Sequence, residues 1–180
     1  MLVELSKADV HRAEVLGRDT VKLCEMQGFK PRLENEDQNR VEANQWGFKA
    51  EFAVARIFNL DPPDLTVVTD GGVDLWMGDL SIDVKLTNAT FGPLVFDSME
   101  KFKADMAVLV GRTGMDNVLS VNGFVWREEF EDKAFEHDFG YGKRLVMKEK
   151  DMGSVERLWF IQVMGEHGRK DEREGSTEEA

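Results

Sequence analysis

Two aspartates and a lysine flank a predicted turn, at spacings that could carry metal chemistry. The dipeptide Gly78-Asp79 is typical of a two-residue β-hairpin turn, and that turn places Asp74 directly opposite Asp83. Directly opposed residues have Cβ atoms roughly 4.5–5.5 Å apart, a distance at which two carboxylates repel each other. A divalent cation bound between them removes the conflict, and oxygen ligands suit Mg²⁺ or Mn²⁺. Lys85 follows on the same face, where an ammonium can orient a water nucleophile or offset negative charge.

The apolar pattern around this turn predicts the register of two strands, residues 73–77 and 80–86. Side chains alternate between the two faces of a strand. One face would carry the apolar residues Val73, Leu75, Met77, Leu80, Ile82, Val84 and Leu86. The other face would carry Asp74, Trp76, Ser81, Asp83 and Lys85. A solvated polar face with weak ion pairs is the alternative for this second set, and Trp76 favours a partly covered surface.

A third carboxylate, Glu51, lies on a helix predicted over residues 40–59. Glu51 borders the apolar arc of this helix, whereas Lys49 and Arg56 mark its wet face. A carboxylate that points toward a sheet needs a partner, because an unpaired buried charge is costly. A metal ion held by the hairpin aspartates would be such a partner. Taken alone, Glu51 also fits a surface glutamate paired with a nearby base.

The remaining elements indicate an α/β (α+β) fold. We expect helices at 6–27, 40–59, 96–103 and 127–135, and strands at 65–69, 73–77, 80–86, 106–110, 118–126 and 145–147. Residues 155–164 close the ordered part in this interpretation. Residues 1–39 form an N-terminal helix and loop in this interpretation, with the loop at 29–38, and residues 40–164 form the core domain. Residues 165–180 are strongly acidic and have the composition of a disordered tail.

The candidate residues resemble the PD-(D/E)xK nuclease superfamily, which they match over roughly residues 40–126. The resemblance implies a restriction-endonuclease-like core, with a central mixed β-sheet flanked by helices. It also implies that Asp74, Asp83 and the carbonyl of Val84 bind Mg²⁺ (or Mn²⁺). Lys85 would then assist the attacking water, and Glu51 would support the metal site.

An acid-x-Lys triplet alone decides nothing, because about two occur by chance in a chain of this composition. The second one here, Glu131-Asp132-Lys133, lies in a helix-like segment without an acidic hairpin partner. Asp83-Val84-Lys85 has strand context, an opposed aspartate and an upstream helix glutamate. One departure is that Val73, and not proline, precedes Asp74. The steps Gly72-Val73-Asp74 and Ile82-Asp83-Val84-Lys85 are similar to those of small virus-encoded members.

Composition bounds the classes of function. The 180 residues carry a formal net charge of −12, the reverse of a basic nucleic-acid-coating protein. The single cysteine, Cys24, excludes an intrachain disulfide, and the three histidines form no zinc motif. No apolar run reaches the length of a membrane span and no signal peptide is apparent, so we expect no membrane partner and an intracellular, cytoplasmic location.

These observations together predict a Mg-dependent deoxyribonuclease that acts on DNA. Lys143 and Arg144 belong to the densest basic cluster of the body and are candidate DNA-phosphate contacts, although an ordinary charged loop fits them equally well. Cutting both strands of a duplex would favour a homodimer. A non-catalytic nuclease-fold module for DNA binding or assembly is the alternative, and an acidic protein that mimics DNA charge is a third.

Overall fold

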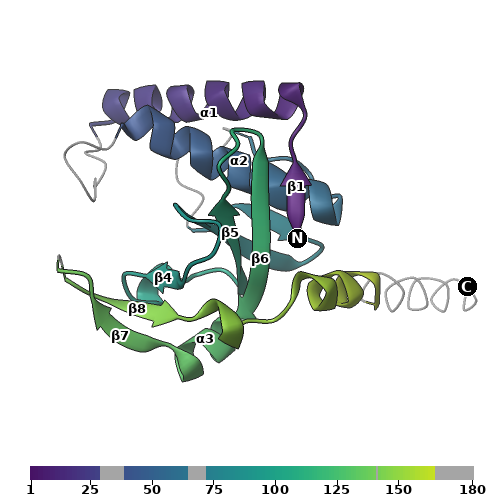
Figure 1. Ribbon diagram of the computed structural model, residues 1–180. Coiled ribbons are helices and arrows are strands. Elements are labelled where there is room, and N and C mark those ends of the chain that lie inside the picture. Colours follow the sequence, from purple (N-terminus) through teal and green to yellow (C-terminus); the bar gives the residue numbers. More distant parts are fainter. Residues whose placement is uncertain (29–38, 65–71, 141, 165–180) are drawn as a thin grey trace, which may run out of the picture.

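Two helices lie side by side over one face of the central sheet (Figure 1). Helix α1 (Lys7–Met26) begins at Ser6, whose side chain accepts the backbone N–H of Asp9, while the Asp9 carboxylate accepts the N–H of Ser6. This capping box satisfies N–H groups that the first turn leaves open. Helix α2 (Arg40–Phe58) begins at Asn39, whose side chain accepts backbone N–H groups of the first turn. Both helices confirm the prediction from apolar spacing.

The computed structural model describes residues 1–28, 39–64, 72–140 and 142–164. Within these residues, five strands form the large sheet, in the order β1-β6-β5-β3-β2. The strands are β1 (Leu2–Glu4), β2 (Leu75–Met77), β3 (Leu80–Thr87), β5 (Met106–Arg112) and β6 (Val118–Trp126). Strands β3 and β5 are parallel and the other neighbours are antiparallel, so the sheet is mixed. The mixed sheet and its helices confirm the α+β class.

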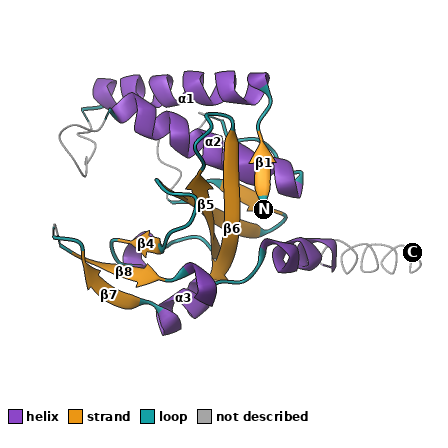
Figure 2. Cartoon of the chain, viewed as in Figure 1, coloured by secondary structure: helices purple, strands orange, loops and turns teal. Residues whose placement is uncertain are grey.

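A small sheet, in the order β4-β8-β7 among the described strands, covers part of the other face (Figure 2). Its strands are β4 (Leu94–Phe96), β7 (Phe135–Asp138) and β8 (Lys143–Met147), and α3 (Arg127–Lys133) lies beside it. The helix predicted at 96–103 is wrong. Its first residue ends β4, which pairs with β8, and the 3-10 turn η1 (Met99–Lys101) follows. A second 3-10 turn, η2 (Glu149–Asp151), follows β8.

Two apolar clusters fill the space on either side of the large sheet. The first lies between the sheet and the helices and includes Ala50, Val54, Phe58, Ile82, Val108 and Phe124. The second lies between the large sheet and the small sheet and includes Phe96, Phe102, Ala107, Leu109, Phe130 and Met147. The rings of Phe96 and Phe102 stack at 4.3 Å between centroids. Strand β5 is buried on both faces, which explains its continuous apolar sequence.

A final helical segment at residues 155–164 packs Val155 and Leu158 into the core. None of the helices in the described residues is both long and apolar enough to cross a membrane. The predicted loop at 29–38, the predicted strand at 65–69 and the acidic tail at 165–180 lie outside the described residues.

Candidate functional site

The hairpin of β2 and β3 has the predicted register. Leu75 pairs with Ile82 and Met77 pairs with Leu80. Gly78 has a φ of 64°, a left-handed conformation that glycine adopts without steric cost, so the turn falls where the sequence predicted it. Apolar alternation and turn chemistry together explain why the register is unambiguous.

Counted outward from the turn, the regular pairing ends at Leu75, so Asp74 lies just beyond the ladder and not within it as predicted. The backbone N–H of Asp74 donates to the carbonyl of Ile82 at 2.8 Å. The carboxylate of Asp74 accepts the backbone N–H of Val84 at 2.6 Å. A side-chain oxygen thus takes the N–H that a ladder carbonyl would have accepted. The prediction of Asp74 and Asp83 as a regular ladder pair is therefore corrected.

This bond nevertheless brings Asp74 to the predicted site. The nitrogen of Val84 is bonded to the carbonyl carbon of Asp83, so the Asp74 carboxylate lies at the peptide that joins the two residues. In an extended strand the N–H and C=O of one residue point to the same side. The carbonyl of Val84 therefore points toward the Asp74 side of β3. Two carboxylates and one backbone carbonyl are gathered within one short stretch of the hairpin.

Asp83 is buried, with 1% of its surface exposed. It pairs with Ala107 across β3 and β5, and Ala107 belongs to the cluster that faces the small sheet. Asp83 therefore projects toward the small sheet and away from α2. A solvated polar face, the alternative weighed from the sequence, is wrong at this position. A buried carboxylate requires compensation by cations or hydrogen bonds.

Lys85 supplies part of that compensation. Its Nζ lies 2.5 Å from an oxygen of Asp83 and 4.9 Å from the ring centroid of Phe96 on β4. The side chain of Lys85 is 37% exposed, so the ion pair joins a buried acid to a cation that reaches solvent. Phe96 holds the ammonium from the side of the small sheet through a cation–π contact. We call Asp74, Asp83, Val84 and Lys85 the hairpin site.

Glu51 lies half-buried on α2, which packs against the opposite face of the large sheet from the one that Asp83 and Lys85 share. In the part of the chain that the structure describes, no group of three or more His, Cys, Asp or Glu side chains is arranged to hold a metal ion. The oxygen ligands that the hairpin itself offers are the carboxylates of Asp74 and Asp83 and the carbonyl of Val84. This donor set has the chemistry that Mg²⁺ or Mn²⁺ prefers.

Two predictions about exposure are wrong. Lys49, predicted on the wet face of α2, is 5% exposed and lies with its Nζ 4.4 Å from the ring centroid of Trp46. The ammonium of Lys49 lies over the indole and 4.0 Å from the carboxylate of Asp116. Trp76, predicted on a partly covered surface, is 60% exposed. It lies on β2, which is the edge strand of the large sheet in the described order.

Ser81 ties the beginning of β3 to the residue before β5. Its N–H and hydroxyl both donate to one carboxylate oxygen of Asp105, at 2.8 and 2.6 Å, and its hydroxyl accepts the N–H of Asp105 at 2.9 Å. The Ser81 hydroxyl and N–H hold the pKa of Asp105 below its usual value. These bonds fix the start of β3, two residues before Asp83. This pair was not predicted, because its two residues lie far apart along the chain.

The two candidate DNA contacts lie on opposite faces of the β7–β8 hairpin, since they are neighbours on β8. Lys143 bonds Glu136 at 2.9 Å, and this carboxylate raises the pKa of Lys143. Arg144 lies 3.1 Å from Asp97, and its side chain is 16% exposed. Each cation is therefore paired with a carboxylate. A phosphate that binds either cation would share it with that carboxylate or displace the carboxylate.

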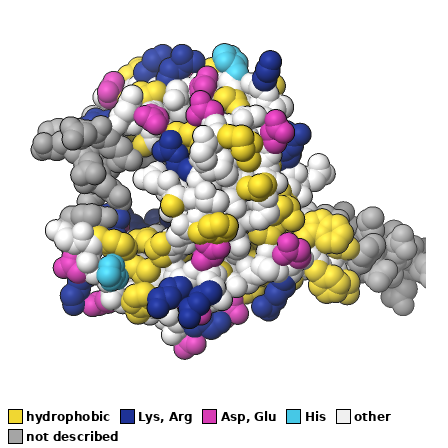
Figure 3. Space-filling view, viewed as in Figure 1, with side chains coloured by type: hydrophobic (Ala, Val, Ile, Leu, Met, Phe, Trp, Pro, Cys, Tyr) yellow, Lys and Arg dark blue, Asp and Glu magenta, His cyan; other side chains and the backbone are white. Residues whose placement is uncertain are grey.

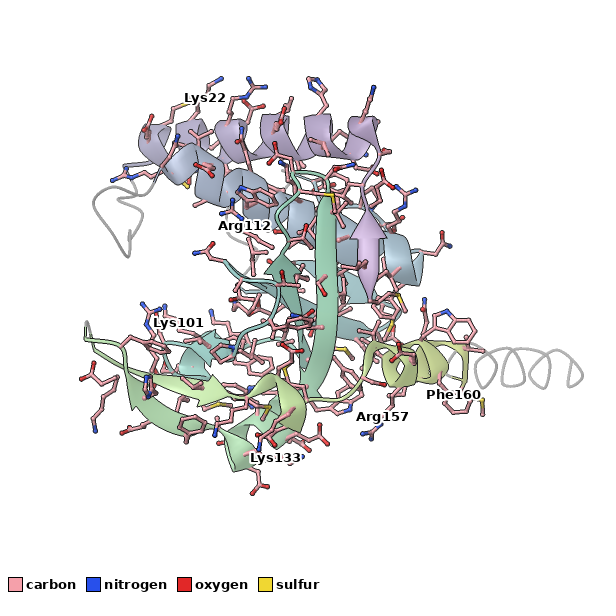
Figure 4. All side chains as sticks on the ribbon, viewed as in Figure 1. Lys22, Lys101, Arg112, Lys133, Arg157 and Phe160 are labelled. Atoms are coloured by element: carbon pink, nitrogen blue, oxygen red, sulfur yellow. The ribbon has the colours of Figure 1, made fainter. Side chains whose placement is uncertain are left out.

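A hollow opens between the helical layer and the small sheet, on the left in Figure 3. Figure 4 places Arg112 above it and Lys101 below it. Arg112 ends β5, and its guanidinium lies 3.9 Å from the ring centroid of Trp46 and 3.4 Å from Asn88. Glu42 lies 3.7 Å from the same guanidinium. Arg112 was not among the predicted site residues, although an arginine at the end of a buried strand is a signal that could have found it.

No protein-family model, curated protein or solved structure matches the chain. The candidate site therefore stands on its geometry, which combines a buried aspartate, a partly exposed lysine and a second aspartate at the peptide between them. This arrangement can hold a divalent cation beside an ammonium, which is a combination suited to hydrolysis at an anionic phosphorus centre.

Proposed function

We propose that the protein is a metal-dependent nuclease that hydrolyses phosphodiester bonds in DNA. The observation that carries the proposal is the hairpin site, where the Asp74 carboxylate bonds the Val84 N–H while Lys85 pairs with the buried Asp83. The chain order also supports a restriction-endonuclease-like core, because a helix (α2) is followed by a hairpin (β2, β3) and then by a strand parallel to β3 (β5).

The residues of the hairpin site would have different roles in the reaction. Asp74, Asp83 and the Val84 carbonyl would hold Mg²⁺ or Mn²⁺; such an ion, when bound, polarises the scissile phosphate and lowers the pKa of a water molecule. An ammonium has three N–H donors, so Lys85 can pair with Asp83 and also orient a water or hold charge on the phosphate. The small sheet limits solvent access on this side, which strengthens each of these interactions.

Glu51 is the supporting residue that the sequence predicted. It lies half-buried on α2, across the large sheet from the face that Asp83 and Lys85 share, so the proposal rests on the hairpin site and not on Glu51. Lys143, Arg144 and Arg112 would contact phosphates. The net charge of −12 makes DNA affinity weak and strongly dependent on salt, so that the substrate depends on local cations and on the metal.

A cleavage assay tests the proposal. Purified protein is incubated with single-stranded, linear duplex, supercoiled and four-way-junction DNA in Mg²⁺, Mn²⁺ or EDTA. Asp83→Asn and Lys85→Met should each reduce metal-dependent cleavage by about a hundredfold or more. The matched controls are Asp19→Asn and Lys22→Met, which alter an aspartate–lysine pair on the exposed face of α1 (Lys22 in Figure 4) and should cleave like the wild type.

Two results would contradict the proposal. Cleavage that survives both hairpin substitutions would place the activity elsewhere or in a contaminant. Absence of cleavage with every substrate and metal would favour the non-catalytic nuclease-fold module.

A further inference from the structure

An aromatic stripe runs along one face of β7. Phe135, His137 and Phe139 alternate with acidic residues, so their rings project from the same face. All three are exposed, Phe135 by 41% and Phe139 by 36%. The rings of His137 and Phe139 meet at 4.6 Å between centroids, so the stripe continues one residue past the strand.

Two cations flank the stripe. His137 pairs with Arg144 across β7 and β8, which puts the guanidinium on the aromatic face. Lys148 follows β8 and places its Nζ 5.6 Å from the ring centroid of Phe135. Aromatic rings and basic side chains are therefore interleaved on the outward face of this hairpin. We call Phe135, His137, Phe139, Arg144 and Lys148 the aromatic face.

The acidic residues of β7 lie on the face of the β7–β8 hairpin opposite to the aromatic face. Glu136 and Asp138 alternate with the rings, and Glu136 is bound to Lys143 at 2.9 Å. On the aromatic face, Arg144 pairs with the carboxylate of Asp97 at 3.1 Å. A hairpin arm that served only as a solvated connection would carry its polar residues outward. This hairpin instead exposes its rings beside the exposed Lys148, while Arg144 is 16% exposed and lies against Asp97.

We infer that the aromatic face binds single-stranded nucleic acid, with bases stacked on Phe135 and Phe139 and phosphates held by Arg144 and Lys148. Proteins that bind single strands without sequence preference combine stacking rings with nearby cations. A phenylalanine ring has no polar atom with which to read a base edge, so the binding should tolerate any sequence. A phosphate would replace Asp97 as the partner of Arg144.

The aromatic face and the hairpin site lie on opposite faces of the same small sheet. Leu145 follows Arg144 on β8, so its side chain points to the other face, where it pairs with Phe96 of β4, and the ring of Phe96 contacts the ammonium of Lys85. A strand held on the aromatic face would therefore reach Lys85 by passing around the edge of the small sheet. The inference rests on the proposed nuclease function, and it names single-stranded nucleic acid as the substrate class.

The experiment measures binding in EDTA, so that no cleavage is needed. Fluorescence anisotropy gives the Kd of the full chain for a labelled single-stranded DNA, for its duplex, for RNA of the same sequence and for an abasic strand of equal length. Phe135→Leu and Phe139→Leu keep apolar bulk but remove the stacking surface, and each should weaken single-strand binding about tenfold. Phe139→Tyr keeps the ring and should bind like the wild type.

The matched control is Phe160→Leu, the same chemical change at an exposed phenylalanine on the helical segment at 155–164, which lies on the opposite side of the molecule in Figure 4. This variant should keep the wild-type Kd. The abasic strand should bind the wild type weakly and should not distinguish the wild type from the leucine variants. Similar Kd values for DNA and RNA would show that the stacked bases, and not the sugars, carry the recognition.

Several results would overturn the inference: leucine variants that bind like the wild type, an abasic strand that binds as tightly as the normal one, or tighter binding of the duplex than of the single strand. Because Asp83→Asn leaves the aromatic face intact, it should bind single strands normally even when it cannot cleave them. Loss of binding in the leucine variants with no cleavage by any protein would support the aromatic face and contradict the nuclease proposal.

Discussion

The carboxylate of Asp74 accepts the backbone N–H of Val84 at 2.6 Å, at the point where the ladder between β2 and β3 ends. The side chain is therefore held at the peptide between Asp83 and Val84 by the protein itself. Preorganisation of this kind lowers the entropic cost of gathering ligands around an ion. It also gives Asp74 two separable roles, one as a hydrogen-bond acceptor and one as a charge.

Asparagine and alanine at position 74 separate these roles. Asp74→Asn keeps a carbonyl oxygen for the Val84 N–H, so we expect its free energy of unfolding in urea to stay within about 0.5 kcal/mol of the wild type. Asp74→Ala leaves that N–H without its acceptor and should lose about 1–2 kcal/mol. Both variants should lose cleavage. Full activity in Asp74→Asn would show that the charge is not needed.

Removal of Lys85 should destabilise the fold, because it leaves the buried carboxylate of Asp83 without its cation. Lys85→Met removes the ammonium 2.5 Å from the buried Asp83 carboxylate. Because Lys85 is partly exposed, solvent screening reduces the cost to about 1–2 kcal/mol, less than for a fully buried pair. The double variant Asp83→Asn/Lys85→Met should recover much of this loss. A double-mutant cycle by urea unfolding measures the coupling, and additive losses would contradict the expected pairing.

The Ser81–Asp105 pair predicts a specific dependence on pH. Hydrogen bonds from Ser81 lower the pKa of Asp105 in the folded state from its ordinary value of 3.8. A group whose pKa is lowered on folding contributes stability above its unfolded pKa, and this contribution is lost as the pH falls through the folded pKa. Asp105→Asn should therefore cost about 0.5–1 kcal/mol near neutral pH, a small effect because the carboxylate is exposed, and progressively less below about pH 4.

Urea unfolding at a series of pH values from neutral to acid checks this expectation for the wild type, for Asp105→Asn and for Asp132→Asn, an exposed carboxylate on α3. A difference between the wild type and Asp105→Asn that stays constant through the acid range would contradict the assignment.

Divalent metal should stabilise the wild-type protein if the hairpin site binds it. An ion that binds only the folded state at a concentration of one hundred times its Kd adds about 2.7 kcal/mol to the free energy of unfolding. We therefore expect Mn²⁺ to raise the Tm of the wild type and EDTA to reverse the rise. Asp83→Asn should show a much smaller shift, whereas Asp19→Asn should respond like the wild type. Equal shifts in all three proteins would place the ion elsewhere.

The hairpin was predictable because its evidence is local. Alternating apolar residues and a glycine turn fixed the pairing of Leu75 with Ile82 and of Met77 with Leu80. The hydrogen bond from the Val84 N–H to the Asp74 carboxylate was not predictable. A side chain accepts such an N–H only where the regular strand pairing has ended, and the sequence does not show where that is. The environment of Lys49 was also missed, since its charge suggested solvent and its contact is the indole face of Trp46.

Other elements depend on contacts that are distant in sequence. The segment at 96–103 looks helical by itself, yet its first residue, Phe96, ends β4 and pairs with Leu145 on β8. The helix predicted at 127–135 in fact stops at Lys133, and Phe135 begins β7, a strand that the sequence analysis did not include. There the signal was present: rings and acids alternate from Phe135 to Phe139, and a period of two is typical of a strand with two different faces.

The pairing of β4 with β8 has a consequence for the order in which the chain assembles during translation. The ribosome releases the β2–β3 hairpin early, but Leu94 finds its ladder partner only when Met147 has emerged. Until then Phe96 has no strand to hold it over Lys85. A nascent chain that ends before β8 thus carries the acidic hairpin without β4 paired above it, and the site reaches its finished form only after residue 147 has been synthesised.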